Sequence, residues 1–377
     1  MKKIYLDNAA TTRPFGTVVD KINQVMLENY GNPSSLHLMG IEAEREVNSA
    51  RERVSELMRK DSNKVYFTSG GTESDNWAIC GAIAGMRDKG RVVTSSIEHK
   101  AVLAPMKKLS EDGYDVQYIK VDSEGVIDLN HLTEILNVDT QLVSIMHVNN
   151  EVGSIQPIKE VIELMKNGAP NALLHVDAVQ SFGKLELDYD ADFISVSAHK
   201  LHGPKGIGAL YIKDIRKIKP FIEGGGQEQN LRSGTENVPA IAGFGTACES
   251  TSITDNYLVA KELKEATISY FESNYPTAVI TSPKDGLPNI LSVSFPAVPA
   301  EVLIHALEDE GIYISAGAAC SEKQQTPSHV LTAMGYINKI VDSNVRISFS
   351  AENTLEEVNY ANNIICRTAS KLATIMR

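Results

Sequence analysis

Short apolar segments alternate with helical patterns over most of the chain, and this alternation constrains the fold more than any other feature. Helical patterns occupy residues 72–87, 99–111, 128–136 and 158–166. We expect strands at Val65–Thr68, Val92–Ser95, Val116–Ile119, Leu142–His147, Ala172–Val176, Phe193–Val196 and Ile207–Ile212. Repeated strand–helix units predict an α/β fold with a mainly parallel, seven-stranded sheet. Sites on such sheets lie at the carboxyl ends of the strands.

The pattern changes after a glycine-rich loop at residues 223–227. A helical region continues to about residue 274 and is followed by mixed elements: a strand at 290–295, a helix at 300–310, a strand near Tyr313 and a strand at 345–349. Thr354 and Glu357 form a capping pair that predicts a final amphipathic helix. We therefore expect an N-terminal segment, residues 1–15, associated with a small domain. A large domain then spans residues 16–254, and a small α+β domain spans residues 255–377.

The composition excludes several classes of function. The chain has 377 residues and a net charge of −12, which argues against non-specific binding to nucleic acids or anionic membranes. No apolar run approaches the span of a bilayer, and the first seven residues do not make a signal peptide. The four cysteines are scattered, so we expect no disulfide framework, no metal site and a reducing, cytoplasmic location.

Lys200 ends the apolar run Phe193-Ile-Ser-Val-Ser-Ala-His-Lys200 and precedes a glycine-rich turn. A lysine at the mouth of a buried strand can lose its proton and form a Schiff base with an aldehyde. Asp177 ends another strand, where a carboxylate could pair with a protonated pyridine nitrogen. The alternative is an aspartate that caps the next turn. Gln180, three residues on, could reach a ring hydroxyl.

The segment Ser69-Gly-Gly-Thr-Glu-Ser-Asp75 follows a strand and opens a helix. Its glycines let the backbone approach a ligand, and free N–H groups at a helix start bind phosphate. A simple tight turn is the alternative interpretation. Ser197 and His199 flank Lys200 and could supply further phosphate donors, although His199 could instead be structural.

Three further polar residues are candidates at strand ends or on a strand. His99 lies where a strand passes into a helix and could stack on a flat ring and move protons, or it could be structural. Asn150 also follows a strand and could donate to a substrate carboxylate or a ring oxygen. Arg346 alternates with apolar residues, and its planar group suits a carboxylate. The alternative for Arg346 is an edge-strand charge facing water.

Cys320 follows a run of small residues and precedes a polar loop, 321–329. An exposed thiol there is a candidate nucleophile. Cys80, Cys248 and Cys366 lie in helical surroundings, and we interpret them as packing residues.

Taken together, these segments resemble the cysteine desulfurases, within the class V aminotransferase group of fold-type I pyridoxal-phosphate enzymes. The matching runs occur in the order of the family and span nearly the whole chain. They are Tyr5-Leu-Asp-Asn-Ala-Ala-Thr-Thr12, Gly31-Asn-Pro-Ser-Ser35 with His37, Phe67-Thr-Ser-Gly-Gly-Thr-Glu-Ser-Asp-Asn76, Glu98-His-Lys100, Val148-Asn-Asn-Glu151, His175-Val-Asp-Ala-Val-Gln-Ser181, Ser197-Ala-His-Lys200, Gly225-Gly-Gln-Glu228, Arg232-Ser-Gly-Thr235 and Ala318-Ala-Cys320.

The resemblance implies pyridoxal 5'-phosphate as cofactor and a role for each candidate. Lys200 would form the Schiff base, Asp177 would pair with the pyridine nitrogen, and His99 would stack on the ring. Gln180 would contact the ring hydroxyl. The phosphate would be held by Gly71, Thr72, Ser197 and His199. Thr235 would reach the phosphate of a partner subunit, which implies a homodimer. Asn150 would contact cofactor and substrate, Arg346 the substrate carboxylate, and Cys320 would be the nucleophile that forms a persulfide.

The implied reaction converts L-cysteine to L-alanine and leaves sulfur on Cys320. The sulfur would then pass to an acceptor protein, such as an iron–sulfur scaffold or a tRNA-thiolation enzyme. Three alternatives remain open. The same scaffold could act on selenocysteine or cysteine sulfinate, it could be an ordinary class V aminotransferase, or it could be a non-catalytic sulfur-carrier or assembly subunit.

The chain departs from the family pattern at three places. The loop reads Ser315-Ala-Gly-Ala-Ala-Cys320 where members usually have Ser-Ser-Gly-Ser-Ala-Cys. After Arg346, where a glycine and often an arginine are usual, it reads Ser350-Ala-Glu-Asn353. It also ends soon after the last helix, without the tail that some members use to bind a scaffold. We expect these departures to affect the loop, the carboxylate site and the choice of acceptor.

Overall fold

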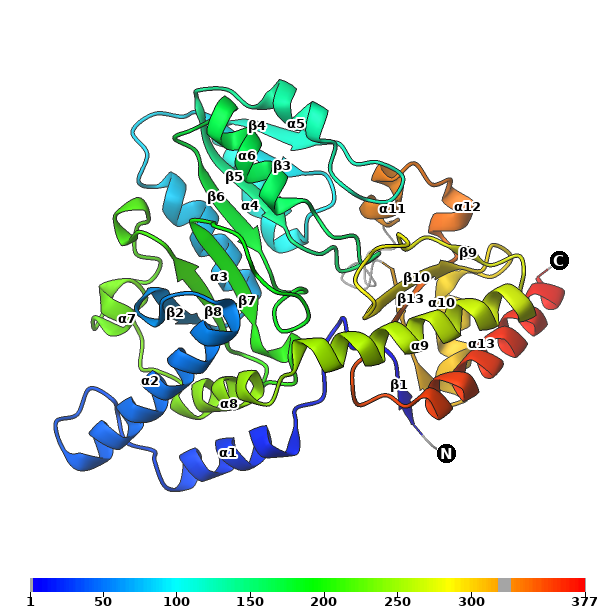
Figure 1. Ribbon diagram of the computed structural model, residues 1–377, viewed down its shortest axis with the longest axis horizontal. Coiled ribbons are helices and arrows are strands. Elements are labelled where there is room, and N and C mark those ends of the chain that lie inside the picture. The colour runs from blue at the N-terminus through cyan, green and yellow to red at the C-terminus, as the bar shows by residue number, and fades with distance from the viewer. Residues whose placement is uncertain (1–2, 318–326, 377) are drawn as a thin grey trace.

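The computed structural model describes residues 3–317 and 327–376. Its largest element is a seven-stranded sheet with the strand order β2-β8-β7-β6-β5-β3-β4 (Figure 1). The strands are β2 (Val65–Thr68), β3 (Arg91–Ser95), β4 (Asp115–Ile119), β5 (Thr140–Met146), β6 (Leu173–Asp177), β7 (Phe193–Ser197) and β8 (Gly208–Ile212). The predicted seven-stranded sheet is confirmed.

The sheet is parallel except at β8, which runs antiparallel to both of its neighbours, β2 and β7. The connection from β7 to β8 covers only residues 198–207. That length is too short for a crossover helix, so the chain reverses direction within the sheet. Lys200 lies in this reversal, in a short 3-10 helix at Ala198–Lys200.

Helices cover both faces of this sheet because neighbouring residues of each strand point to opposite faces. Val143 and Leu174 face one apolar cluster, whereas Leu142 and Leu173 face the other. The first cluster also holds residues of α2 (Leu38–Met58), α5 (Leu129–Ile135), α6 (Ile158–Gly168) and α8 (Val238–Glu249). The second cluster holds residues of α4 (Lys100–Glu111) and Trp77. Trp77 begins a π-helical turn, Trp77–Gly81, which continues α3 (Gly71–Asn76). The helix α1 (Gly16–Leu27) packs on α8, and the short α7 (Gln227–Asn230) lies before α8 in the chain.

A second, four-stranded antiparallel sheet has the order β12-β13-β10-β9. Its strands are β9 (Val279–Ile280), β10 (Ile290–Ser294), β12 (Ser315–Ala316) and β13 (Asn344–Ser348). The long helices α9 (Ile253–Asn274) and α13 (Leu355–Ile375) pack side by side against it (Figure 1). Shorter helices are α10 (Ala300–Glu308), α11 (His329–Ala333) and α12 (Asn338–Val341). The predicted capping box of Thr354 and Glu357 is confirmed at the start of α13.

The N-terminal segment joins the two sheets. Strand β1 (Ile4–Tyr5) pairs in parallel with β11 (Ile312–Tyr313), next to the second sheet. A few residues later, the backbone N–H of Thr12 donates to the carbonyl of His199. Part of residues 1–15 thus pairs with the C-terminal part, and the expected assignment of the whole segment to a small domain stays a prediction. The expected boundary at residues 254 and 255 stays a prediction, and it falls within the first turn of α9.

Three of the four cysteines lie among the described residues. Cys248 and Cys366 are buried and Cys80 is half-buried, and burial raises the pKa of each thiol. These properties suit packing residues. Cys320 lies outside the described residues. Within the described part of the chain, no helix combines the length and the apolar character needed to cross a membrane.

Candidate active site

Ten of the predicted site residues line one cavity of about 420 Å³. It lies at the carboxyl ends of strands β5, β6 and β7, where a parallel sheet is expected to carry its site. The ten are Gly71, Thr72, His99, Asn150, Asp177, Gln180, Ser197, His199, Lys200 and Arg346. The sequence did not single out Asp7, Ala9, Ala10 and Asp75, which line the same cavity.

The amine of Lys200 is held by the N-terminal segment. Its Nζ atom donates to the carbonyl oxygens of Ala9 and Ala10, each at 2.7 Å. The segment that pairs with the second sheet therefore also forms a wall of the cavity on the first. No local pattern could have indicated these contacts, because 190 and 191 residues separate the partners.

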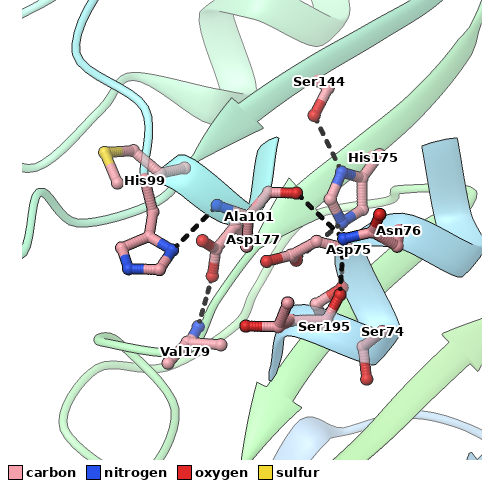
Figure 2. A network of polar contacts seen from close by, with 12 residues as sticks. Ser74, Asp75, Asn76, His99, Ala101, Ser144, His175, Asp177, Val179 and Ser195 are labelled. Atoms are coloured by element: carbon pink, nitrogen blue, oxygen red, sulfur yellow. Dashed lines mark hydrogen bonds and ion pairs between the residues drawn. The ribbon is translucent and has the colours of Figure 1, made fainter. Parts of the chain in front are cut away.

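Asp177, the last residue of β6, fits both interpretations of the sequence. Its Oδ1 atom accepts a hydrogen bond from the backbone N–H of Val179 at 2.9 Å, so it caps the following turn (Figure 2). The same carboxyl group lines the cavity. Burial, together with the nearby Asp75, raises the pKa of Asp177 to about 7. A cationic group of a ligand beside it would favour the ionised carboxylate.

Behind Asp177 lies a buried network centred on His175 (Figure 2). The Nδ1 atom of His175 lies 2.8 Å from Ser144 Oγ, and its Nε2 atom lies 2.9 Å from Ser195 Oγ. Asp75 Oδ1 lies 3.5 Å from the same Nε2 atom. Burial lowers the pKa of His175 to about 4 and raises that of Asp75 to about 7. His175 is therefore neutral near pH 7, and both Asp75 and Asp177 line the cavity beside it.

His99 also combines its two predicted roles. As the residue before α4, it accepts a hydrogen bond from the backbone N–H of Ala101 at Nδ1, at 3.1 Å (Figure 2). Burial, and then the charge on Lys200, lowers its pKa to about 4. The imidazole is therefore neutral near pH 7, and the proton resides on Nε2 because Nδ1 accepts.

The start of α3 lies against β7. A Cβ atom on Gly70 would lie 3.9 Å from Ser197 Oγ, and one on Gly71 would lie 3.7 Å from Ser197 Cβ. The Ser197 hydroxyl is buried and has no hydrogen-bond partner among the described residues. His199, on the same wall, has its Nδ1 atom 3.3 Å from Thr11 Oγ1. A helix start with an unpaired hydroxyl beside it suits a phosphate group.

Arg346 is buried on β13, which has a neighbouring strand on each side. The water-facing interpretation is therefore wrong. Its Nη2 atom pairs with Asp7 Oδ1 at 2.8 Å, and its Nη1 atom donates to the carbonyl oxygen of Asn150 at 2.8 Å. Burial of the guanidinium is possible because the N-terminal segment supplies this carboxylate.

Two predicted residues do not lie in this cavity. Thr235 is exposed and is not among its lining residues. Cys320 lies outside the described residues, but Gly317 and Pro327 line a second cavity of about 730 Å³. Asp7 and Ser315 line both cavities, so the two adjoin.

A family model described as aminotransferase class-V matches residues 4–360. The chain belongs to the class-V aminotransferase family. Within this family, the cysteine desulfurase IscS of Methanosarcina thermophila is 40% identical over 377 residues, which cover 98% of this chain and 93% of that protein. A NifS/IcsS protein homolog of Lactobacillus delbrueckii subsp. bulgaricus is 42% identical, with 94% of each chain covered. These relatives confirm the resemblance to cysteine desulfurases.

Solved structures of class-V aminotransferase relatives agree. A NifS-like protein superposes with a TM-score of 0.92 at 40% identity, with 98% of this chain and 100% of that chain covered. Members of this family use pyridoxal phosphate, and the cavity residues fit that cofactor. They combine the start of α3, a buried Ser197 hydroxyl with no hydrogen-bond partner among the described residues, a buried carboxyl group and a lysine amine.

Proposed function

We propose that the protein is a pyridoxal-phosphate-dependent cysteine desulfurase, which converts L-cysteine to L-alanine and passes the sulfur to Cys320. One observation carries this proposal: a single cavity is lined by the amine of Lys200, the carboxyl group of Asp177 and the guanidinium of Arg346. The cysteine desulfurase and the NifS-like protein that match nearly the full chain support the same reaction.

The cofactor would be held at both ends. Lys200 would bind it covalently, Asp177 would pair with the ring nitrogen, and Gln180 would contact the ring hydroxyl. The phosphate would be bound by Gly71, Thr72, Ser197 and His199. When bound, pyridoxal phosphate supplies an electron sink for the pair released at the substrate Cα atom.

The substrate carboxylate would bind Arg346, with Asn150 beside it. The Nε atom of Arg346 is buried and has no hydrogen-bond partner among the described residues, so the guanidinium retains donor capacity beyond Asp7 and Asn150. Once displaced by the substrate amine, the Lys200 amine would remove the proton from Cα. Its position beside the Ala9 and Ala10 carbonyls keeps it at the cavity wall.

His99 would act as a hydrogen-bond donor and a ring contact. With a pKa of about 4 it is a weak base at neutral pH, so it is poorly suited to take the proton of the Cys320 thiol.

The sulfur step balances without an external oxidant. The Cys320 thiolate attacks the substrate sulfur, an S–S bond forms, and the bond from that sulfur to Cβ breaks. The electron pair of the broken bond stays with carbon, which takes up a proton and leaves as L-alanine. The sum is L-cysteine plus a thiol giving L-alanine plus a persulfide. We propose that an acceptor protein, such as an iron–sulfur scaffold or a tRNA-thiolation enzyme, then takes the sulfur in the cytoplasm.

We further propose that the protein acts as a homodimer in which Thr235 reaches the cofactor phosphate of the partner. Two features support this. Thr235 is exposed, and its neighbour Glu236 lines a groove shared with Pro33 and Ser34. Close to that groove in sequence, Leu36 is 97% exposed and Leu38 is 65% exposed, as in an uncovered interface.

Mass analysis of the intact protein after incubation with L-cysteine tests the function directly. We expect the mass of one added sulfur atom at Cys320, and an equal amount of L-alanine released in a single turnover. The variant C320S should keep the Schiff-base absorbance of the loaded protein and gain no sulfur. The variant K200A should lose that absorbance and form no alanine.

Other outcomes would favour the alternatives. Sulfide release by C320S at the wild-type rate would indicate direct elimination, of the kind expected for a selenocysteine or cysteine sulfinate enzyme. An unmodified Cys320 with normal absorbance would indicate an aminotransferase or a non-catalytic subunit. An unchanged absorbance in K200A would disprove the cofactor assignment.

A further inference from the structure

Lys184 is a buried lysine in the turn that follows β6, and the proposed reaction gives it no role. Only 8% of the residue is exposed, and no carboxylate of the described residues lies within ion-pair distance of it. The charges that act most strongly on it are those of Lys200 and Arg346, both positive, and its own charge acts on His199 and His202. Burial and these two cations lower the pKa of Lys184 to about 7. An uncompensated buried cation is costly, so this position calls for an explanation.

Within the described residues, the hydrogen-bond partner of the Lys184 Nζ atom is the carboxamide of Gln180. The Nζ atom donates to Gln180 Oε1 at 3.4 Å, and Gln180 Nε2 donates to the carbonyl oxygen of Ala9 at 2.9 Å. A carbonyl can only accept and an ammonium can only donate, so these two partners fix which end of the amide is which. One N–H of Gln180 then remains for the cavity that this residue lines.

The turn that carries Lys184 is held close to Lys200. Gly183 has a φ of +72°, and a Cβ atom at this residue would lie 2.1 Å from Cδ1 of Leu201. The backbone of residue 183 therefore packs directly against the residue after Lys200. Lys184 and Lys200 also line one small cavity, of about 20 Å³, together with Ser350 and Ala351, where the chain departs from its family. The position of Lys184 is thus fixed relative to Lys200.

We propose that Lys184 is a positioning residue for the cofactor. It holds the Gln180 carboxamide so that an N–H, and not the carbonyl oxygen, faces the cavity, and this selects a ligand oxygen that accepts a hydrogen bond. It also places a positive charge near that oxygen and near Lys200. This inference rests on the proposed function, because the ring hydroxyl of pyridoxal phosphate is the oxygen it would select.

Lys264 provides a matched control within the chain. It is equally buried, at 6% exposed, and it donates to a backbone carbonyl, that of Leu287, at 3.4 Å. Burial lowers its pKa as well, to about 8. Lys264 does not line the 420 Å³ cavity. A general effect of removing a buried lysine should therefore appear equally in K264M and K184M.

The experiment titrates pyridoxal phosphate into the apoprotein of K184M, Q180A, the double variant and K264M, and follows the Schiff-base absorbance. We expect K184M to weaken binding about tenfold, the value of one hydrogen bond to a charged group. In the Q180A background, the same substitution should change binding by less than about twofold, because Lys184 acts through Gln180. K264M should bind like the wild type.

A second readout is the pH titration of the same absorbance in the loaded proteins. Removal of a positive charge near Lys200 should move the midpoint to higher pH in K184M, while K184R should restore the wild-type midpoint. Equal losses of affinity in the wild-type and Q180A backgrounds, or an equal loss in K264M, would overturn the proposal. An absence of Schiff-base absorbance in the wild type itself would instead overturn the proposed function.

Discussion

Several ionisable side chains around the cavity are buried, and burial opposes the charged form of each. Burial raises the pKa of Glu98 to about 8 and lowers that of His147 to about 4. Glu98 nevertheless remains bonded, since its Oε1 atom accepts from the Met146 backbone N–H at 3.0 Å. Glu98 and His147 are therefore largely neutral near pH 7.

Lys264 allows the free-energy cost of burying a charged side chain to be measured away from the cavity. Its pKa in the folded chain is about 8, below the value of about 10.4 in an unfolded chain. The unfolded state therefore binds more protons between these values, and the cost of burying the charge grows as the pH falls from 10.4 to 8. We expect K264M to raise the free energy of unfolding by roughly 3 kcal/mol at pH 7.

The measurement is urea unfolding of the variant and the wild type at pH 7, 9 and 10.5. The difference between them should shrink steadily over this range and vanish near the top. A difference that did not depend on pH would mean that packing, and not charge, is responsible.

The sequence identified the residue types of the site well but not their partners. Lys200, Asp177 and His99 each stand at the end of a strand or the start of a helix, so local patterns were enough to find them. Asp7 and Lys184 carry no such signal. Their importance depends on contacts between segments far apart in the chain, such as the pair of Asp7 with Arg346, 339 residues away.

Between elements, β8 approaches the start of α3 closely near the site. A Cβ atom on Gly208 would lie 2.6 Å from the carbonyl oxygen of Val196 and 2.7 Å from Cα of Gly70. Both are backbone atoms of paired or adjoining segments, so neither can move cheaply. Only glycine at position 208 allows α3 to begin against the sheet.

We therefore expect G208A to lower the free energy of unfolding by on the order of 2 kcal/mol, as other overpacked cores do. It should also weaken pyridoxal phosphate binding, because Gly70 precedes the first turn that lines the cavity. Thermal unfolding and titration of the apoprotein measure the two effects. G16A is the control: a Cβ atom there would meet nothing within 4 Å, and stability should be unchanged or slightly higher.

Elements of the large sheet were predicted to within two residues at each end, because apolar runs and helical patterns separate cleanly there. The antiparallel direction of β8 was not predicted, since no strand pattern encodes direction. The two-residue strands β1, β9 and β12 also escaped notice, apart from the expected association of the N-terminal segment. Such short pairings exist only because other parts of the chain place them together.

At the scale of the whole molecule, the proposed homodimer predicts that two defective subunits can together form one intact site, which a monomer could not do. A mixed dimer contains one K200A subunit and one T235A subunit. Its one complete site would combine Lys200 of the T235A subunit with Thr235 of the K200A subunit. We expect one Schiff base per mixed dimer, with wild-type affinity for pyridoxal phosphate. T235A homodimers should bind pyridoxal phosphate more weakly, and K200A homodimers should form no Schiff base.

Differently tagged subunits, copurified through both tags, supply the mixed species. Titration of its apoprotein with pyridoxal phosphate gives the affinity and the number of sites. An affinity equal to that of the T235A homodimer would contradict the assignment of Thr235 to the partner's site.

The path of the N-terminal segment has a consequence for biosynthesis. Ile4 pairs with Ile312, and Asp7 bridges to Ser348, so the first ten residues reach their final place only after almost the whole chain has left the ribosome. Those same residues supply the carbonyls that hold Lys200. The large sheet can assemble during translation, but the contacts of Lys200 with the N-terminal segment must wait for the last elements. We therefore expect loading with cofactor to be one of the final steps in the maturation of each molecule.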